Sequence, residues 1–115
     1  MKLICFRPGA EPEYVESSCS VEDLTEGLGG TVRIEPLEHT PLIVISNDEG
    51  ARLQLPLNRV QWTGGKARAI RGTFYVGRMS RERDVIKTRK SDIELADRLL
   101  SPLHILKGDG NNEEA

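Results

Sequence analysis

The stretch RLQLPLNRVQWTGGKARAIRGTFYVGR, residues 52–78, carries the strongest pattern in this 115-residue chain. It holds five arginines, the single tryptophan and no carboxylate. From Ala69 onward, side chains alternate with the two-residue period of a β-strand that has one face buried. We therefore predict one continuous strand whose core face carries Ile70, Gly72, Phe74 and Val76. The opposite face, called the polar face below, then carries Arg71, Thr73 and Tyr75.

The residues before this strand are expected to form a loop. Pro56 donates no backbone hydrogen bond, and Asn58 favours local side-chain to backbone bonds, so the PLNR segment should interrupt strand pairing. The glycine pair at 64–65 adds flexibility. We expect this loop to fold over the polar face and to bring three further side chains there, namely Asn58, Arg59 and Trp62.

Further strands are predicted on both sides of the loop. Residues 2–6 read as a strand that ends at Arg7-Pro8-Gly9, with an edge-strand hairpin partner in the EPEYVES segment. TVRIE at 31–35 alternates, with Val32 and Ile34 inward. The run 42–45 is continuously apolar, as in a strand covered on both faces, and it is our choice for the central strand. Its hairpin partner is expected at 52–55, across an NDEG turn.

Two short helices complete the prediction. Ser20 opens a capping box before an apolar stripe, and Gly29-Gly30 ends that helix. Ser91 opens a second helix, whose inward stripe is Ile93, Ala96, Leu99 and Leu100. The expected fold class is α+β, with a mixed, mainly antiparallel sheet of five to six strands and two short helices in a single domain over 1–107. Residues 108–115 should form a disordered acidic tail.

Composition restricts the cellular setting. No apolar run approaches the roughly 20 residues that cross a bilayer, and the N-terminus turns polar too early for a signal peptide. We therefore expect a soluble cytoplasmic protein with no membrane partner. Cys5 and Cys19 should be buried thiols in a reducing compartment. Exposed sheet edges favour a homo-oligomer.

Charge is distributed unevenly along the chain. Residues 1–50 hold three basic residues against ten carboxylates, whereas residues 51–107 are strongly basic. The basic half either faces an anionic partner or pairs with the acidic half, and the sequence leaves both readings open. DNA binding is not expected, because the net charge is −2 and no DNA-binding motif is present.

Motifs for catalysis are absent from the sequence. His39 and His104 are isolated, so no metal site is expected, and no nucleophile or phosphate-loop motif occurs. We expect a non-enzymatic protein without a cofactor. The candidate ligand-binding residues are those of the loop and the polar face, with Arg78 at the strand end: Asn58, Arg59, Trp62, Arg71, Thr73, Tyr75 and Arg78.

These residue types match an anionic, nucleotide-like ligand. Arg59 and Arg71 would hold phosphate, Thr73 and Asn58 would donate hydrogen bonds, and an aromatic ring of Trp62 or Tyr75 would stack on a base. A structural role for the same residues is equally concrete. Arg59 would then pair with carboxylates of the acidic half, Trp62 would cover the core, and Asn58 would hold its own turn.

The order of these features resembles a family of small uncharacterised proteins, a domain of unknown function that bacteriophages and other mobile elements encode. The resemblance covers roughly residues 1 to 100. It is carried by Arg7-Pro8-Gly9, Gly29-Gly30, VRIEPL at 32–37, NDEG at 47–50, LPLNR at 55–59, IRGTFYVGR at 70–78 and SDIE at 91–94. It implies a phage-like origin and no defined enzyme activity.

The resulting functional expectation is a phage-type protein in the host cytoplasm that sequesters an anionic nucleotide-derived signalling molecule and so counters host defence. The alternative is a protein-protein interaction module that inhibits a host factor, such as a defence protein, through its basic half.

Overall fold

The computed structural model describes residues 2–16, 28, 31–82 and 84–102. Antiparallel strands make up nearly half of this part of the chain, and it forms one helix, α2. The elements are β1 (Lys2–Phe6), β2 (Glu13–Glu16), β3 (Val32–Pro36), β4 (Leu42–Asn47), β5 (Leu57–Thr63), β6 (Lys66–Arg71), β7 (Phe74–Met79), β8 (Val85–Ile86), α2 (Lys90–Leu99) and β9 (Ser101–Pro102).

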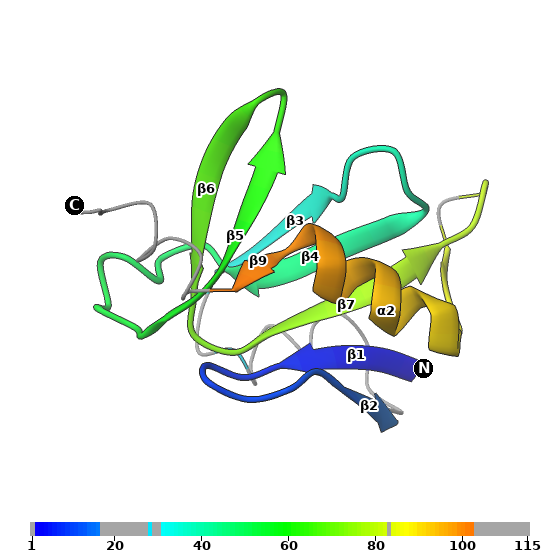
Figure 1. Cartoon of the computed structure of the whole chain (residues 1–115), viewed down its shortest axis with the longest axis horizontal. Helices are drawn as coiled ribbons and strands as arrows, with labels where there is room; N and C mark the ends of the chain where they lie inside the picture. The colour runs from blue at the N-terminus through cyan, green and yellow to red at the C-terminus, as the bar shows by residue number, and fades with distance from the viewer. Residues whose placement is uncertain (1, 17–27, 29–30, 83, 103–115) are drawn as a thin grey trace.

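The strands form two sheets, in which every pairing is antiparallel. The large sheet has the order β2-β1-β7-β4-β3, with β8 also paired to β7, and the small sheet has the order β6-β5-β9. In Figure 1, α2 crosses one face of the large sheet, while the β5–β6 hairpin stands away from it.

The predicted α+β class with two helices is wrong. The fold is nearly all-β, because segments expected to be loops are strands and the described residues contain only the single ten-residue helix α2. The helix expected from Ser20 to Gly30 falls largely outside the described residues, as does the tail expected at 108–115. Helix α2 begins at Lys90 and carries the predicted stripe, which packs on the large sheet.

The main core lies between the large sheet, α2 and the small sheet. Phe6 and Phe74 stack at its centre, with ring centroids 4.8 Å apart. The predicted core face is confirmed, since Ile70, Phe74 and Val76 all belong to this buried cluster. A second cluster on the other face of the large sheet contains Leu3, Ile43 and Ile45.

The continuous strand predicted over 69–76 is wrong, because the chain changes sheets within it. Gly72 has a φ of +78°, which L side chains rarely adopt, and it separates β6 of the small sheet from β7 of the large sheet. Its backbone N–H bonds to the Pro56 carbonyl at 2.7 Å. The alternation continues through the bend, so the core residues stay on one side although their strands belong to different sheets.

The predicted loop at 56–62 is also wrong. Residues from Leu57 onward form β5, which pairs with β6 across a two-residue turn at Gly64-Gly65. Both glycines have positive φ, as a tight hairpin turn of this length requires. The hairpin arm predicted at 52–55 does not form either. Those residues lie in turns, and β4 pairs instead with β3 and β7.

Other strand predictions are confirmed. β1 pairs with β2, which is an edge strand, and all six residues of β4 are buried between β7 and β3. The middle strand of the large sheet is nevertheless β7. Ile34 of β3, expected to face inward, is 47 % exposed.

Cys5 is a buried thiol whose pKa is raised by burial, whereas Cys19 lies outside the described residues. Within the described ranges, no helix is long and apolar enough to cross a membrane.

Candidate functional site

A pocket of about 370 Å³ lies between the two sheets, at the side where β6 approaches β4. Its volume is within the range of about 300–1,000 Å³ that is typical of ligand sites. The lining combines three arginines and an aspartate with small or apolar residues. It consists of Arg33, Ser46, Asn47, Asp48, Gly50, Ala51, Arg68, Ala69, Ile70 and Arg71.

Arg68 of β6 places a half-buried guanidinium in this pocket. Its Nη2 donates a hydrogen bond of 2.8 Å to Oε1 of Gln61, which is fully buried on the neighbouring strand β5. No described carboxylate forms an ion pair with Arg68. Burial, followed by repulsion from Arg33, lowers the pKa of Arg68. The nearby carboxylates of Glu35 and Asp48 oppose this shift without forming an ion pair with Arg68, so the pocket contains a half-buried cation that no described carboxylate contacts directly.

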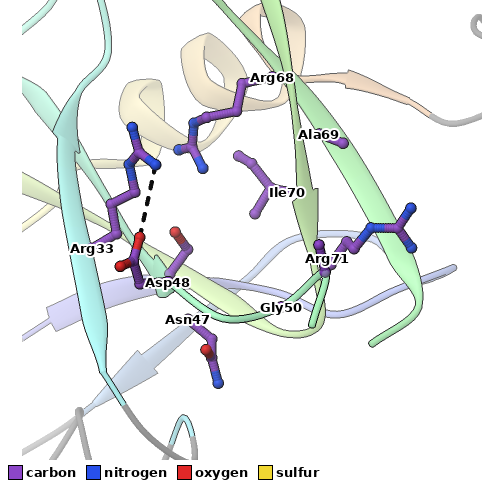
Figure 2. Close-up of a pocket in the computed structure, with 10 residues that line it drawn as sticks. Arg33, Asn47, Asp48, Gly50, Arg68, Ala69, Ile70 and Arg71 are labelled. Atoms are coloured by element: carbon purple, nitrogen blue, oxygen red, sulfur yellow. Dashed lines mark ion pairs between the residues drawn. The ribbon is translucent and has the colours of Figure 1, made fainter. Parts of the chain in front are cut away.

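Arg33 of β3 faces Arg68 from the opposite sheet. Its Nε donates to Glu35 at 2.8 Å, and its Nη1 lies 3.7 Å from Asp48 Oδ1. Figure 2 shows the guanidinium groups of Arg33 and Arg68 directed toward each other across the pocket. Two opposed guanidinium groups repel, and an anion between them would remove that repulsion.

Ser46 contributes a buried hydroxyl to the same pocket. It is the cross-strand partner of Arg33, so both side chains share the face of the large sheet that looks toward β6. Ser46 is 1 % exposed, and its hydroxyl bonds to no residue that the structure describes. Buried polar groups are normally hydrogen-bonded, so this hydroxyl is an exception that calls for an explanation.

Arg71 is the one predicted ligand residue that lines this pocket, and it does so with its stem. Its Nη1 donates to the Leu55 carbonyl at 3.2 Å. In Figure 2 the Arg71 guanidinium points away from Arg33 and Arg68. Arg71 therefore shapes the pocket wall while its charge lies outside.

Arg59 donates hydrogen bonds to residues at the C-terminal end of α2. It is 8 % exposed, and its Nη1 donates to Asp97 Oδ1 at 2.9 Å and to the carbonyls of Asp97 and Leu100 at 3.3 and 2.8 Å. Its guanidinium carbon also lies 5.0 Å from the Phe6 ring centroid. The carbonyls at a helix C-terminus lack partners within the helix, and Arg59 supplies donors to them.

Asn58 and Arg78 also hold the fold together. The Asn58 amide donates to the carbonyls of Phe6 and Gly72 at 3.0 and 2.8 Å, which fixes the bend between β6 and β7. Arg78 bonds to Asp92 at 2.8 Å, and Asp92 accepts the Arg89 backbone N–H at the start of α2. Both side chains therefore have hydrogen-bond partners within the protein.

The remaining predicted residues line other pockets. Thr73 and Tyr75 border a mainly apolar pocket with Leu55 and Pro56, and burial raises the pKa of Tyr75. Trp62, 49 % exposed, lines a third pocket with residues of α2 and of the β3–β4 turn. The seven predicted residues are thus not gathered in one place, and the loop expected to gather them is strand β5.

Sequence reasoning missed Arg33, Ser46 and Arg68. Arg68 precedes Ile70 by two residues, and residues two apart in a β-strand lie on the same face. The alternation could therefore have placed Arg68 on the same face as Ile70. Arg33 and Ser46 lie on strands that meet β6 only through the packing of the sheets, and no local pattern indicates that approach. Among the described residues, no three His, Cys, Asp or Glu side chains gather in a way that would hold a metal ion.

Among the described residues, ion pairs between the acidic and the basic half are scarce. In the part of the chain that the structure describes, the only ion pair that joins residues 1–50 to residues 51–107 is the local contact of Arg52 with Glu49. Arg59 and Arg78 pair with carboxylates of their own half. Several basic side chains of the second half therefore keep their charge available to a partner.

Comparison with known families agrees with one part of the resemblance, that to an uncharacterised family with a domain of unknown function. No curated protein and no solved structure matches the chain. The model of one protein family, described as Domain of unknown function (DUF3846), matches residues 1–100. With this match over most of its length, the chain belongs to the DUF3846 family.

Proposed function

We propose that this protein binds a small anionic ligand in the pocket between the two sheets, through Arg33 and Arg68. The observation that carries the proposal is the half-buried Arg68, which forms no ion pair with a described carboxylate and faces the guanidinium group of Arg33. A phosphate or carboxylate group between them would form charge-assisted hydrogen bonds in a partly desolvated site.

The proposed activity is binding without chemistry. The pocket walls supply charge, hydroxyl and small apolar groups, and none of the described aromatic side chains lines it. A nucleotide-derived ligand would therefore be held by its phosphate, whereas the stacking once expected from Trp62 or Tyr75 has no place there.

We also propose a setting for this binding. The resemblance at LPLNR and GTF supports a phage or mobile-element protein that sequesters an anionic nucleotide-derived signal and so counters host defence. Sequestration requires only tight binding, and two opposed arginines would contribute to it through charge-assisted hydrogen bonds to the anion.

Replacement of Arg68 by alanine should weaken anion binding by at least about tenfold, because it removes one charge-assisted interaction worth roughly 1.5–3 kcal/mol. Arg33→Gln should have a similar effect. Isothermal titration calorimetry with sodium phosphate, cyclic nucleotides and ADP-ribose measures the change, and circular dichroism checks that each variant is folded.

Arg71→Ala is the matched control, because Arg71 borders the same pocket but directs its charge away. It should leave the affinity nearly unchanged. The proposal fails if none of the anions binds the unmodified protein, or if Arg71→Ala weakens binding as much as Arg68→Ala does.

A second candidate function rests on a different surface. A pocket beside the start of α2 is lined by four cationic side chains, those of Lys2, Lys87, Arg89 and Lys90, together with Tyr14 and Thr88. None of the four cations forms an ion pair with a described residue. This surface favours an interaction module that docks onto an acidic host protein.

Reversing two of these charges, in the double variant Lys87→Glu and Lys90→Glu, separates the two candidates. Both residues are exposed, so the variant should fold normally. If the surface docks a protein, capture of acidic host proteins in a pull-down should be lost, while calorimetric phosphate binding at Arg68 persists. Unchanged capture would exclude this surface as the docking site.

A further inference from the structure

Ser46 marks the inner wall of the pocket as a place for a hydrogen-bonding ligand group. The hydroxyl is buried, and it has no partner among the described residues. Such a group lowers stability unless something bonds to it, and a ligand hydroxyl would do so as either donor or acceptor. An anion that bonds only to the guanidinium groups would leave the Ser46 hydroxyl without a hydrogen-bond partner.

Asp48 adds an acceptor at the same pocket. Its carboxylate lies 3.7 Å from Arg33 Nη1, too far for a good hydrogen bond, and its side chain is 45 % exposed. Asp48 would repel an anionic ligand group, so such a group lies on the Arg68 side of the space between the two guanidinium groups. A hydroxyl group on the same ligand would be attracted, because an ionised carboxylate only accepts hydrogen bonds.

The remaining walls restrict the size and type of the ligand. Gly50, Ala69 and Ile70 offer small or apolar surface without an aromatic ring. The volume of about 370 Å³ lies near the lower end of the range of about 300–1,000 Å³ for ligand pockets. A compact ligand that carries hydroxyl groups close to its anionic group suits these walls.

We infer that the pocket binds a phosphorylated polyol, either a free sugar phosphate or the ribose-phosphate part of a nucleotide. The phosphate lies between Arg68 and Arg33, and sugar hydroxyls bond to Ser46 and Asp48. This inference rests on the proposed anion binding and specifies its ligand class. Ser46 is then a specificity-determining residue, because its hydrogen bond raises the affinity for ligands that carry a hydroxyl group beside the phosphate.

The test compares sodium phosphate, ribose, ribose 5-phosphate and adenosine 5′-monophosphate by isothermal titration calorimetry. Ribose 5-phosphate should bind at least about tenfold more tightly than phosphate, because it forms one or two additional hydrogen bonds. Ribose, which lacks the phosphate, should not bind measurably. Adenosine monophosphate should match ribose 5-phosphate, since the walls offer no stacking surface.

Ser46→Ala should bring the affinities for ribose 5-phosphate and phosphate close together while phosphate binding stays unchanged. The ligand-free variant should melt at the same temperature or higher, because a buried hydroxyl without a partner is removed. Asp48→Ala should weaken ribose 5-phosphate binding but strengthen phosphate binding, a pair of opposite shifts that a purely structural role would not produce. Ser91→Ala, at an exposed position of α2, is the control that should change neither affinity.

The inference is overturned if ribose 5-phosphate binds no more tightly than phosphate, if Ser46→Ala leaves their ratio unchanged, or if the adenine base adds about tenfold or more in affinity. In each of these cases phosphate still binds and the proposed function stands. If neither phosphate nor ribose 5-phosphate binds, the proposed function fails together with the inference.

Discussion

Arg59→Met is expected to destabilise the protein by about 3 kcal/mol, because it removes the donors that hold the end of α2. The substitution keeps much of the side-chain volume but leaves the carbonyls of Asp97 and Leu100 without the guanidinium. It also removes the cation that lies 5.0 Å from the Phe6 ring centroid. The Asp97 side chain is 42 % exposed and remains hydrated after the change, which places the loss at the lower end of the range for broken buried ion pairs.

Urea denaturation followed by circular dichroism measures this loss as a shift of the midpoint at constant slope. Arg52→Met is the matched control. Arg52 is 68 % exposed, and Glu49 is its only ion-pair partner among the described residues, so its replacement should change the free energy of unfolding by less than about 1 kcal/mol. A loss at Arg59 as small as the loss at Arg52 would contradict the structural role and return Arg59 to the candidate ligand residues.

Asn58→Ala is expected to cost about 2–3 kcal/mol. The amide is buried and donates to two carbonyls, those of Phe6 and Gly72, which lie 52 and 14 residues away in the sequence. After truncation both carbonyls lose a donor, and the space left by the side chain adds a cavity cost. The bend at Gly72 should loosen, since Asn58 ties it to the end of β1.

Asn58→Asp distinguishes hydrogen bonding from packing, because it keeps the shape and removes the donor. A carboxylate directed at two carbonyl oxygens should be at least as destabilising as alanine at neutral pH. Both variants are compared by urea denaturation with the unmodified protein. If Asn58→Asp were as stable as the unmodified protein, the amide donor would play no part in holding the bend.

Asn58 and Arg59 show why the roles of the candidate ligand residues could be predicted only in part from the sequence. The sequence left open whether Asn58, Arg59 and Trp62 bind a ligand or hold the fold. In the structure, Asn58 and Arg59 both bond to partners far along the chain, which favours the role of holding the fold. Arg59 reaches Asp97, which lies 38 residues away, and Asn58 reaches Phe6, which lies 52 residues away. No local spacing contains that information.

The sequence by itself determined which side chains of the 70–76 segment and of α2 enter the core, although it did not do so for Ile34 of β3. Strand alternation placed Ile70, Phe74 and Val76 together, and helical spacing placed the stripe of α2, because both periods follow from backbone geometry within a few residues. These predictions survived even where the strand boundary was wrong, since the bend at Gly72 preserves the alternation.

Only the tertiary structure decided what each arginine does. Arg33, Arg59, Arg68, Arg71 and Arg78 look alike as residues on or beside strands, yet two hold helix α2, one bonds to a loop carbonyl and two face each other between the sheets. A guanidinium reaches several ångströms from its backbone and takes whichever acceptor the packing of distant segments provides. Burial follows local periodicity, whereas the pairing of charge depends on the path of the whole chain.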